Sequence, residues 1–136
     1  MIRINIVAND TTTVAKVVLF DEKNRVLFLK RSNYMEKFAG DWDLPGGHLK
    51  PNESLIEGLA RETMEETQLD VRDPVFLLQM DNLHFFYAKY DSQIVKLSNE
   101  HTDYRFFDQS DLDPSEKFQN VAIKAMERLK NENISN

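Results

Sequence analysis

Apolar and polar positions alternate in short stretches along the first third of the chain, as is typical of β-strands. Residues 2–6 carry isoleucine at every second position, and two apolar runs follow at Val14–Phe20 and at residues 26–29. The polar residues 21–24 between these runs predict a turn. We therefore expect three strands, followed by a glycine-containing loop over residues 32–47.

The middle of the chain predicts one helix and then further strands. Residues 53–67 are rich in glutamate, leucine and alanine, which favour a helix. The runs at Val75–Met80 and at residues 83–90 predict two strands, and residues 94–97 and 104–107 predict two shorter ones.

A C-terminal amphipathic helix is predicted behind residue 113. Asp113 is placed as the N-cap residue, with Pro114 in the first helical position and Glu116 as the capping-box glutamate. Apolar residues recur behind it at helical spacing: Phe118, Val121, Ala122, Ala125 and Leu129. The whole pattern predicts a single domain over residues 1–136, of mixed α/β (α+β) class, with helices covering a sheet.

Composition narrows the class of protein. A chain of 136 residues that is 41% apolar can bury one core, and no apolar run is long enough to cross a bilayer. The N-terminus does not have the pattern of a secretory signal, so we expect a cytoplasmic protein. The absence of cysteine excludes disulfides and thiolate metal sites.

The formal net charge of -6 disfavours long DNA or RNA as a partner, because the phosphates would be repelled. The same charge would repel a nucleotide. An acidic enzyme that binds phosphates therefore needs metal ions, and its carboxylates are the natural ligands for them.

Three glutamates on the predicted helix carry the main chemical signal. Glu62, Glu65 and Glu66 fall within one turn, where like charges destabilise a helix unless a cation neutralises them. Magnesium or manganese would do so, because hard cations prefer carboxylate oxygen. For the three glutamates alone, a solvated acidic face is the competing interpretation.

The rest of the helix is expected to hold these carboxylates in place. On a helical wheel, Gly58 lies on the glutamate side, where it would leave room for a ligand. Leu55 falls on the wrong side of this division, and the wheel does not explain it. The residues that point away from the glutamates, and that we expect to pack on the sheet, are Ile56, Leu59, Ala60 and Thr63.

Residues 47–69 resemble the Nudix box, a glycine followed at fixed spacing by Glu, Arg-Glu, Glu-Glu and an apolar residue. The matching residues are Gly47, Glu53, Arg61, Glu62, Glu65, Glu66 and Leu69. Thr63 stands at an apolar position, and Gln68 replaces the last glycine, which would end the helix in a left-handed conformation. Residues 42–47 and 100–107 also resemble Nudix segments, so the likeness covers essentially the whole chain and implies the Nudix fold, a mixed sheet between helices.

The resemblance implies a role for each matching residue. Glu62, Glu65 and Glu66 would bind Mg²⁺ or Mn²⁺, joined by the backbone carbonyl of Gly47 and by Glu100. Glu53 and Arg61 would form an ion pair that holds the loop against the helix. The reaction would be attack of water on a phosphorus of a pyrophosphate, with either Glu66 or Glu100 accepting the proton.

Substrate contacts are less clearly marked. Lys30 and Arg31 end a strand just before the loop and would clamp a phosphate, although a plain strand-end charge pair explains them equally well. Trp42 and Tyr87 would stack on a base, but buried aromatics more often belong to a core. The histidines show no spacing typical of a zinc site.

The function expected is metal-dependent hydrolysis of a pyrophosphate bond in a nucleoside diphosphate linked to another group, of the dinucleoside polyphosphate or ADP-ribose type. The alternatives are a nucleoside triphosphate pyrophosphohydrolase that cleanses the nucleotide pool, and a non-catalytic Nudix-fold binding module. We expect a small nucleotide-like substrate as partner, with no long nucleic acid and no membrane. A homodimer stays open.

Overall fold

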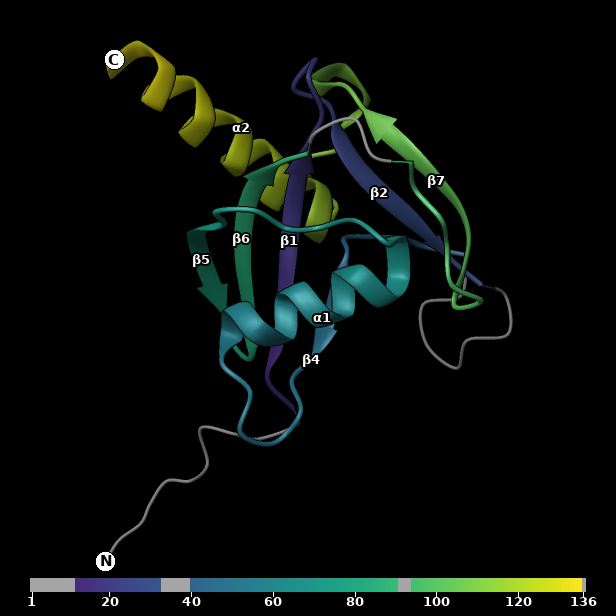
Figure 1. Cartoon of the computed structure of the whole chain (residues 1–136). Helices are drawn as coiled ribbons and strands as arrows, with labels where there is room; N and C mark the ends of the chain where they lie inside the picture. The colour runs from purple at the N-terminus through teal and green to yellow at the C-terminus, as the bar shows by residue number, and fades with distance from the viewer. Residues whose placement is uncertain (1–11, 33–39, 91–93, 136) are drawn as a thin grey trace, which may run out of the picture.

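The fold comes from a computed structural model that describes residues 12–32, 40–90 and 94–135. The strand expected at residues 2–6 lies outside the described residues. Within them, the strands form one mixed sheet with a helix on each face, as Figure 1 shows. The sequence-based prediction of a mixed α/β sandwich is therefore confirmed.

Strand β1 (Val14–Phe20) is the buried centre of the sheet. Strand β6 (Leu83–Lys89) runs parallel to it along its whole length on one side. On the other side, β4 (Gly46–His48) pairs with the first half of β1, and β2 (Val26–Arg31) pairs with it only at Phe20 and Val26. The early part of β1 is thus left for β4, the strand that carries two glycines next to the acidic helix.

The remaining strands extend the sheet at both ends. Strand β5 (Val75–Met80) pairs antiparallel with β6. Strands β3 (Trp42–Asp43) and β7 (His101–Phe107) both pair with β2, which lies between them. In Figure 1, β2 and β7 lie side by side and turn away from the direction of β1.

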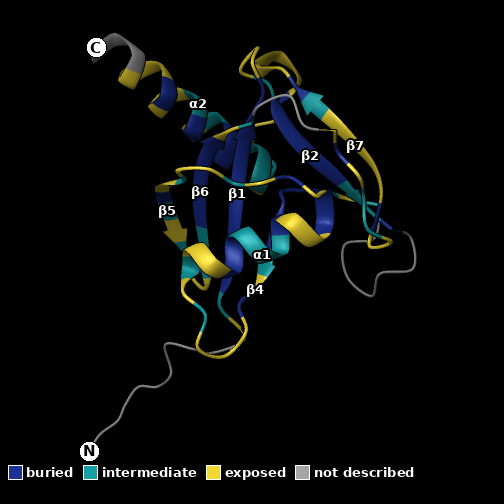
Figure 2. Ribbon diagram, viewed as in Figure 1, coloured by how far each residue is buried: buried dark blue, intermediate teal, exposed yellow. Residues whose placement is uncertain are grey.

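The two helices cover opposite faces. Helix α1 (Leu55–Thr67) packs over a cluster that includes Val17, Leu29 and Phe86. Helix α2 (Lys117–Ser135) packs over the larger aromatic cluster on the other face. The residues that α2 buries there are Val121, Ala122, Ala125 and Leu129, which confirms the predicted apolar spacing. Figure 2 shows this burial as dark blue along the part of α2 nearest the sheet.

Two predictions about the chain between these elements were wrong. The stretch expected as a loop over residues 32–47 contains β3 and β4, too short for a periodic pattern to reveal. The strand expected at residues 94–97 is absent from the described structure. There the backbone amides of Lys96 and Ser98 donate instead to the carbonyls of Thr67 and Glu66, which ties this segment to the end of α1.

The start of α2 was also misplaced. Asp113 does not cap the helix, because its carboxylate accepts from the amide and hydroxyl of Ser115 in a preceding turn. Glu116 takes the capping role, since its carboxylate accepts from the amide of Gln119 at 2.8 Å. The capping-box pattern therefore marks the turn before α2, and the helix begins at Lys117.

Candidate active site

Helix α1 has well-defined ends, which fixes the positions of its glutamates. Ser54 is the N-cap residue and forms a reciprocal capping box with Glu57. Gln68 ends the helix in the left-handed conformation, with φ 61° and ψ 23°. Gln68 therefore adopts the left-handed geometry of the glycine that usually stands at this position, a point that the sequence had left open.

The buried side of α1 differs from the one expected. Ile56 is 45% exposed, so its predicted packing on the sheet is wrong, and Leu55 packs against the core in its place. The residues that α1 buries are Gly58, Leu59, Thr63, Glu66 and Thr67. The buried stripe therefore runs through one of the three glutamates and does not lie opposite them.

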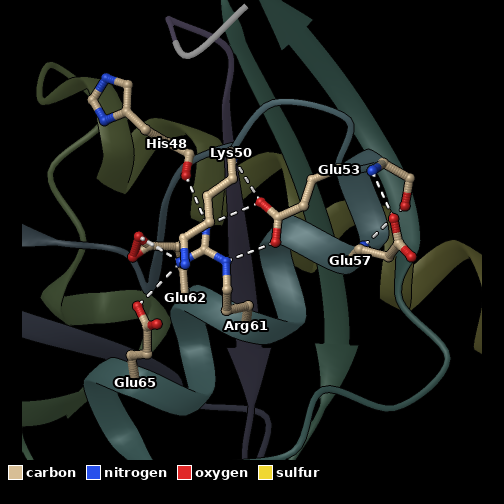
Figure 3. Close-up of polar contacts among 8 residues, drawn as sticks. His48, Lys50, Glu53, Glu57, Arg61, Glu62 and Glu65 are labelled. Carbon is tan, nitrogen blue, oxygen red and sulfur yellow. Dashed lines mark hydrogen bonds and ion pairs between the residues drawn. The ribbon is translucent and has the colours of Figure 1, made fainter. Parts of the chain in front are cut away.

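Arg61 is the centre of a polar network at the surface of α1 (Figure 3). Its Nε donates to Oε2 of Glu53 at 2.7 Å and its Nη2 donates to Oε1 of the same carboxylate at 3.0 Å. Nη2 also donates to the carbonyl of His48 at the end of β4, at 3.0 Å. The predicted ion pair between Glu53 and Arg61 is confirmed, and it holds the loop before α1 against the helix.

The same contacts set the charge of the pair. Hydrogen bonds from Arg61 and from the backbone amide of Lys50 lower the pKa of Glu53 to about 2. The hydrogen bond to Glu53 raises the pKa of Arg61 above its ordinary value. Both groups are thus charged at neutral pH, as a charge-assisted bidentate pair requires.

Glu62 and Glu65 lie on the other side of the Arg61 guanidinium (Figure 3). The Nη1 of Arg61 is 3.2 Å from Oε1 of Glu65 and 3.6 Å from Oε2 of Glu62. The Glu65 side chain is 54% exposed, whereas that of Glu62 is 19% exposed. Glu65 therefore faces solvent while Glu62 turns toward β4.

Glu66 is the buried member of the three. Its Oε1 accepts from the amide of Gly46 on β4 at 2.9 Å. Burial raises the pKa of Glu66 to about 8, and the charges of Asp43 and Glu62 add to that effect, whereas Lys16 and the Gly46 amide oppose it. Burying a carboxylate costs free energy of folding, and carboxylates with raised pKa values are found mostly at functional sites.

Two glycines make the close approach of β4 and α1 possible. A Cβ atom at Gly46 would meet the carbonyl oxygen of Ala15 on β1 at 2.1 Å. A Cβ atom at Gly47 would meet the carboxyl carbon of Glu62 at 2.7 Å. The Glu66 and Glu62 side chains thus lie directly against the two glycines of β4, which brings Glu62 next to Gly47 as the Nudix-like spacing suggested.

Gly58 has a different purpose from the one expected. A Cβ atom there would meet the side chain of Leu49 at 2.8 Å and Oε1 of Glu53 at 3.2 Å. Leu49 is a core residue that is 3% exposed. The space beside Gly58 is therefore filled by the protein, and the expectation that it admits a ligand is wrong.

Glu100 lies in a turn that is fastened to the site from two directions. The amide of Ser98 donates to the carbonyl of Glu66, and the amide of Ser32 donates to the carbonyl of Glu100. The charge of Glu100 contributes to raising the pKa of Glu62, after the larger effect of burial. The late segment is thus brought to the acidic helix, although Glu100 itself is exposed.

A buried charged network that sequence reasoning missed lies beneath the β3–β4 segment. Nζ of Lys16 donates to Oδ1 of Asp43 at 2.9 Å, and Nη1 of Arg31 donates to Oδ2 at 3.1 Å. His101 is buried beside these charges, and its pKa is lowered to about 4, mainly by burial. A lysine inside the apolar run Val14–Phe20 was the available signal for this network.

The predicted substrate residues are not brought together. Arg31 points to Asp43, and Tyr87 is buried on the α2 side, where its hydroxyl bonds to Glu132. Lys30 stands opposite Trp42 in the pairing of β2 with β3. Trp42 also packs edge-on against Phe107. Their roles in binding a substrate stay predictions, and the structure adds support for none of them.

Comparison of the sequence with known protein families shows which family the chain belongs to. A model of the NUDIX domain matches residues 10–129. The chain belongs to the Nudix family. The match includes every residue of the site described above.

Individual relatives are similar over shorter stretches. A putative 8-oxo-dGTP diphosphatase of Bacillus subtilis is 41% identical over 56 residues, which are 41% of this chain and 34% of that protein. The chain spans between 14% and 51% of the length of the curated relatives it matches.

Solved structures share the fold. The MutT protein of Methanosarcina mazei is 30% identical, with a TM-score of 0.63 over 89% of this chain and 94% of that one. An Ap4A hydrolase of C. elegans is 21% identical, with a TM-score of 0.69 over 88% of this chain and 99% of that one.

None of the helices in the described residues is long and apolar enough to cross a membrane.

The donor chemistry of this Nudix helix suits a hard divalent cation. The carboxylates of Glu62 and Glu66 lie against β4, and burial, followed by the charges of Glu65 and Glu100, raises the pKa of Glu62. Among the described residues, however, no three acidic or imidazole side chains are grouped closely enough to hold a metal as they stand. Glu65 is paired with Arg61, so cation binding would require it to turn.

Proposed function

We propose that this Nudix domain hydrolyses a phosphoanhydride bond of a nucleoside phosphate with the help of a divalent cation. The observation that carries the proposal is the pair of acidic side chains held on β4, Glu66 on the Gly46 amide and Glu62 against Gly47. A buried carboxylate of raised pKa beside other acidic groups is typical of a metal ligand or a general base.

Different residues of the chain would bind the cation and hold the loop in place. Glu62, Glu65 and Glu66 would hold Mg²⁺ or Mn²⁺ together with the carbonyl of Gly47 and with Glu100. When bound, the cation would supply charge neutralisation on the phosphate oxygens and a lower pKa for the attacking water. Arg61 and Glu53 keep the loop and the helix in register while this happens.

Glu66 and Glu100 are both kept as acceptors of the proton from water. Glu66 has one oxygen engaged by Gly46, which fixes the direction of the other. Glu100 is exposed and lies near Glu62. If Glu66 is the base, Glu66→Gln lowers kcat at saturating Mn²⁺ far more than Glu100→Gln does, and the reverse order under the same condition would identify Glu100.

For the substrate class, the sequence relatives favour oxidised nucleoside phosphates, since their names include both 8-oxo-dGTP diphosphatases and 8-oxo-dGDP phosphatases. The relative from Bacillus subtilis is named a putative 8-oxo-dGTP diphosphatase. A nucleoside diphosphate linked to another group, of the dinucleoside polyphosphate or ADP-ribose type, was the first expectation from sequence. It drew on the loop over residues 32–46, part of which lies outside the described residues, and on Tyr87, whose hydroxyl bonds to Glu132. It enters the test as the competing class.

The deciding experiment compares kcat/KM for dGTP, 8-oxo-dGTP, ADP-ribose, diadenosine tetraphosphate and capped RNA in Mg²⁺. We expect turnover that disappears in excess EDTA, with a nucleoside triphosphate as the preferred substrate. A preference for ADP-ribose or the dinucleotide would move the protein to the competing class. Wild-type turnover that persists in EDTA, or no turnover of any compound with Mg²⁺ or Mn²⁺, would refute the proposed reaction.

A further inference from the structure

Lys16 is a charged residue in the buried central strand. Its side chain is 10% exposed, and both neighbours in β1, Ala15 and Val17, are fully buried. Its Nζ also lies 5.6 Å from the centre of the Phe118 ring on α2. Burying a lysine in this way costs free energy unless the ammonium group is fully engaged.

The ammonium group is engaged with the segment that leads into β4. Nζ donates to Oδ1 of Asp43 at 2.9 Å and to the carbonyl oxygen of Leu44 at 3.1 Å. The backbone of the next residue in β1 continues the contact, because the amide of Val17 donates to the carbonyl of Pro45 at 2.9 Å. Three consecutive residues, 43 to 45, are therefore fastened to β1 around Lys16.

This segment ends at the two glycines that support the acidic side chains. Gly46 pairs with Lys16 in the register of β4 against β1, and its amide holds the Glu66 carboxylate. The Glu62 carboxyl group lies against Gly47. A shift of residues 43–45 would therefore move the backbone on which both carboxylates rest.

We propose that Lys16 is a positioning residue for the cation-binding carboxylates, acting through Asp43, Leu44 and the backbone of Gly46 and Gly47. The proposal rests on the proposed function for the identity of the bound ion. Lys16 contacts neither the substrate nor the reacting atoms in this assignment. Residues that orient metal ligands in this way typically contribute about 10–100-fold to metal affinity.

Stability alone is a weak explanation for such a pair. Replacing a whole buried ion pair by apolar residues is often neutral or stabilising, whereas removing one partner is destabilising when it leaves the other charge unpaired. Arg31 donates to the second oxygen of Asp43, and loss of Lys16 would leave that carboxylate paired. A variant without Lys16 is therefore expected to fold.

The test compares Lys16→Met with the matched control Lys89→Met, which removes an exposed lysine at the end of β6. Mn²⁺ binding is measured by electron paramagnetic resonance without nucleotide, and exchange of the Gly46 amide proton is measured by NMR. We expect Lys16→Met to weaken Mn²⁺ binding about 10–100-fold and to speed Gly46 exchange, and Lys89→Met to do neither. Lys16→Arg, which keeps a charged donor, should recover part of the affinity.

A folded Lys16→Met protein with wild-type Mn²⁺ affinity and wild-type Gly46 exchange would overturn the proposal, since a merely structural lysine would lower the melting temperature alone. Lys16→Gln is measured in parallel and decides by the same two readouts if the methionine variant does not fold. A wild-type protein that binds no Mn²⁺ would instead refute the proposed function. In that case the Gly46 exchange rate alone decides whether Lys16 positions the β4 backbone.

Discussion

The two helices cover opposite faces of one sheet but bury different kinds of side chain. Helix α2 buries Val121, Ala122, Ala125 and Leu129, all apolar. Helix α1 buries a glycine, two threonines and a glutamate beside a single leucine. Since apolar burial is the main stabilising contribution to a fold, α2 contributes mostly stability, whereas α1 gives up stability to hold acidic groups against β4. Substitutions on the two helices should therefore separate activity from stability.

The largest expected effect is on activity and comes from α1. Glu66→Gln removes the charge but keeps an oxygen that accepts from Gly46. We expect kcat to fall about 100-fold or more, because several kcal/mol of metal-borne stabilisation depend on this group. In metal-free buffer at about pH 9, above the pKa of Glu66, the melting temperature should stay at or above that of the wild type, since a neutral amide costs less to bury than a carboxylate. Steady-state kinetics and thermal melting measure both, and an unfolded variant with no activity would contradict the separation.

The counterpart on α2 should affect stability alone. Leu129 is buried against the aromatic cluster, and Leu129→Ala should lower the free energy of unfolding by about 2–3 kcal/mol. At a temperature where the variant is folded, kcat and KM should be unchanged. Urea unfolding and kinetics on the same sample provide the check. A change in kcat of more than a few-fold would show that α2 also shapes the site.

A smaller effect is expected inside α1, where Thr63 is fully buried. Its hydroxyl has no hydrogen-bond partner within the described structure. Thr63→Val removes that unsatisfied group and should raise the free energy of unfolding by about 1 kcal/mol. Thr67→Val is the matched control, because the Thr67 hydroxyl donates to the carbonyl of Thr63 and accepts from Leu69. The control should destabilise by a similar amount, and the same sign for both variants would refute this assignment.

The end of α1 offers another gain. Gln68 adopts a left-handed conformation that favours glycine. Gln68→Gly should stabilise the protein by about 0.5–1 kcal/mol, because the relief of backbone strain exceeds the added entropy of the unfolded chain. Gln68→Ala keeps the strained backbone and should show no gain. Denaturant midpoints of the two variants decide between them.

The smallest effect concerns pH and the surface of α1. The pKa of Glu53 is lowered to about 2 in the folded protein. Its pairing with Arg61 therefore stabilises the fold at pH values above the ordinary pKa of a glutamate. That contribution should be lost as the pH falls from about 4.5 toward 2. The difference in melting temperature between wild type and Glu53→Gln should therefore shrink over this range. A difference that stays constant with pH would show that the ion pair does not stabilise the fold.

The sequence predicted long periodic elements and the box well, and it failed where local pattern and tertiary contact disagree. Strand β1 and helix α1 were predicted to within two residues because their patterns are long. The wheel placed Ile56 inside and left Leu55 unexplained, since it assumed that all glutamates face away from the core. Residues 94–97 were predicted as a strand from their apolar side chains. Val95 is indeed buried, but the backbone of this segment binds the end of α1 and pairs with no strand in the described structure.

The site was predictable only as far as the motif extends. Glu53 and Arg61 pair as the Nudix box implies, because that contact is local and strong. Asp43 and Lys16 are 27 positions apart, and nothing in either segment alone predicts that they meet. Tyr87 shows a similar limit. The alternation along β6 shows which residues share a face of the sheet, but not that the face of Tyr87 is the one that α2 covers.

The space shared by Gly58 and Leu49 has a consequence for how this sequence can change over time. A single volume is divided between these two positions, so a larger residue at 58 is tolerated only where 49 becomes smaller. The two sites lie on different elements and contact each other directly, and selection would act on their sum. Among relatives of this chain, alanine at the first position should accompany a residue smaller than leucine at the second, and an alignment would register the two as a covarying pair.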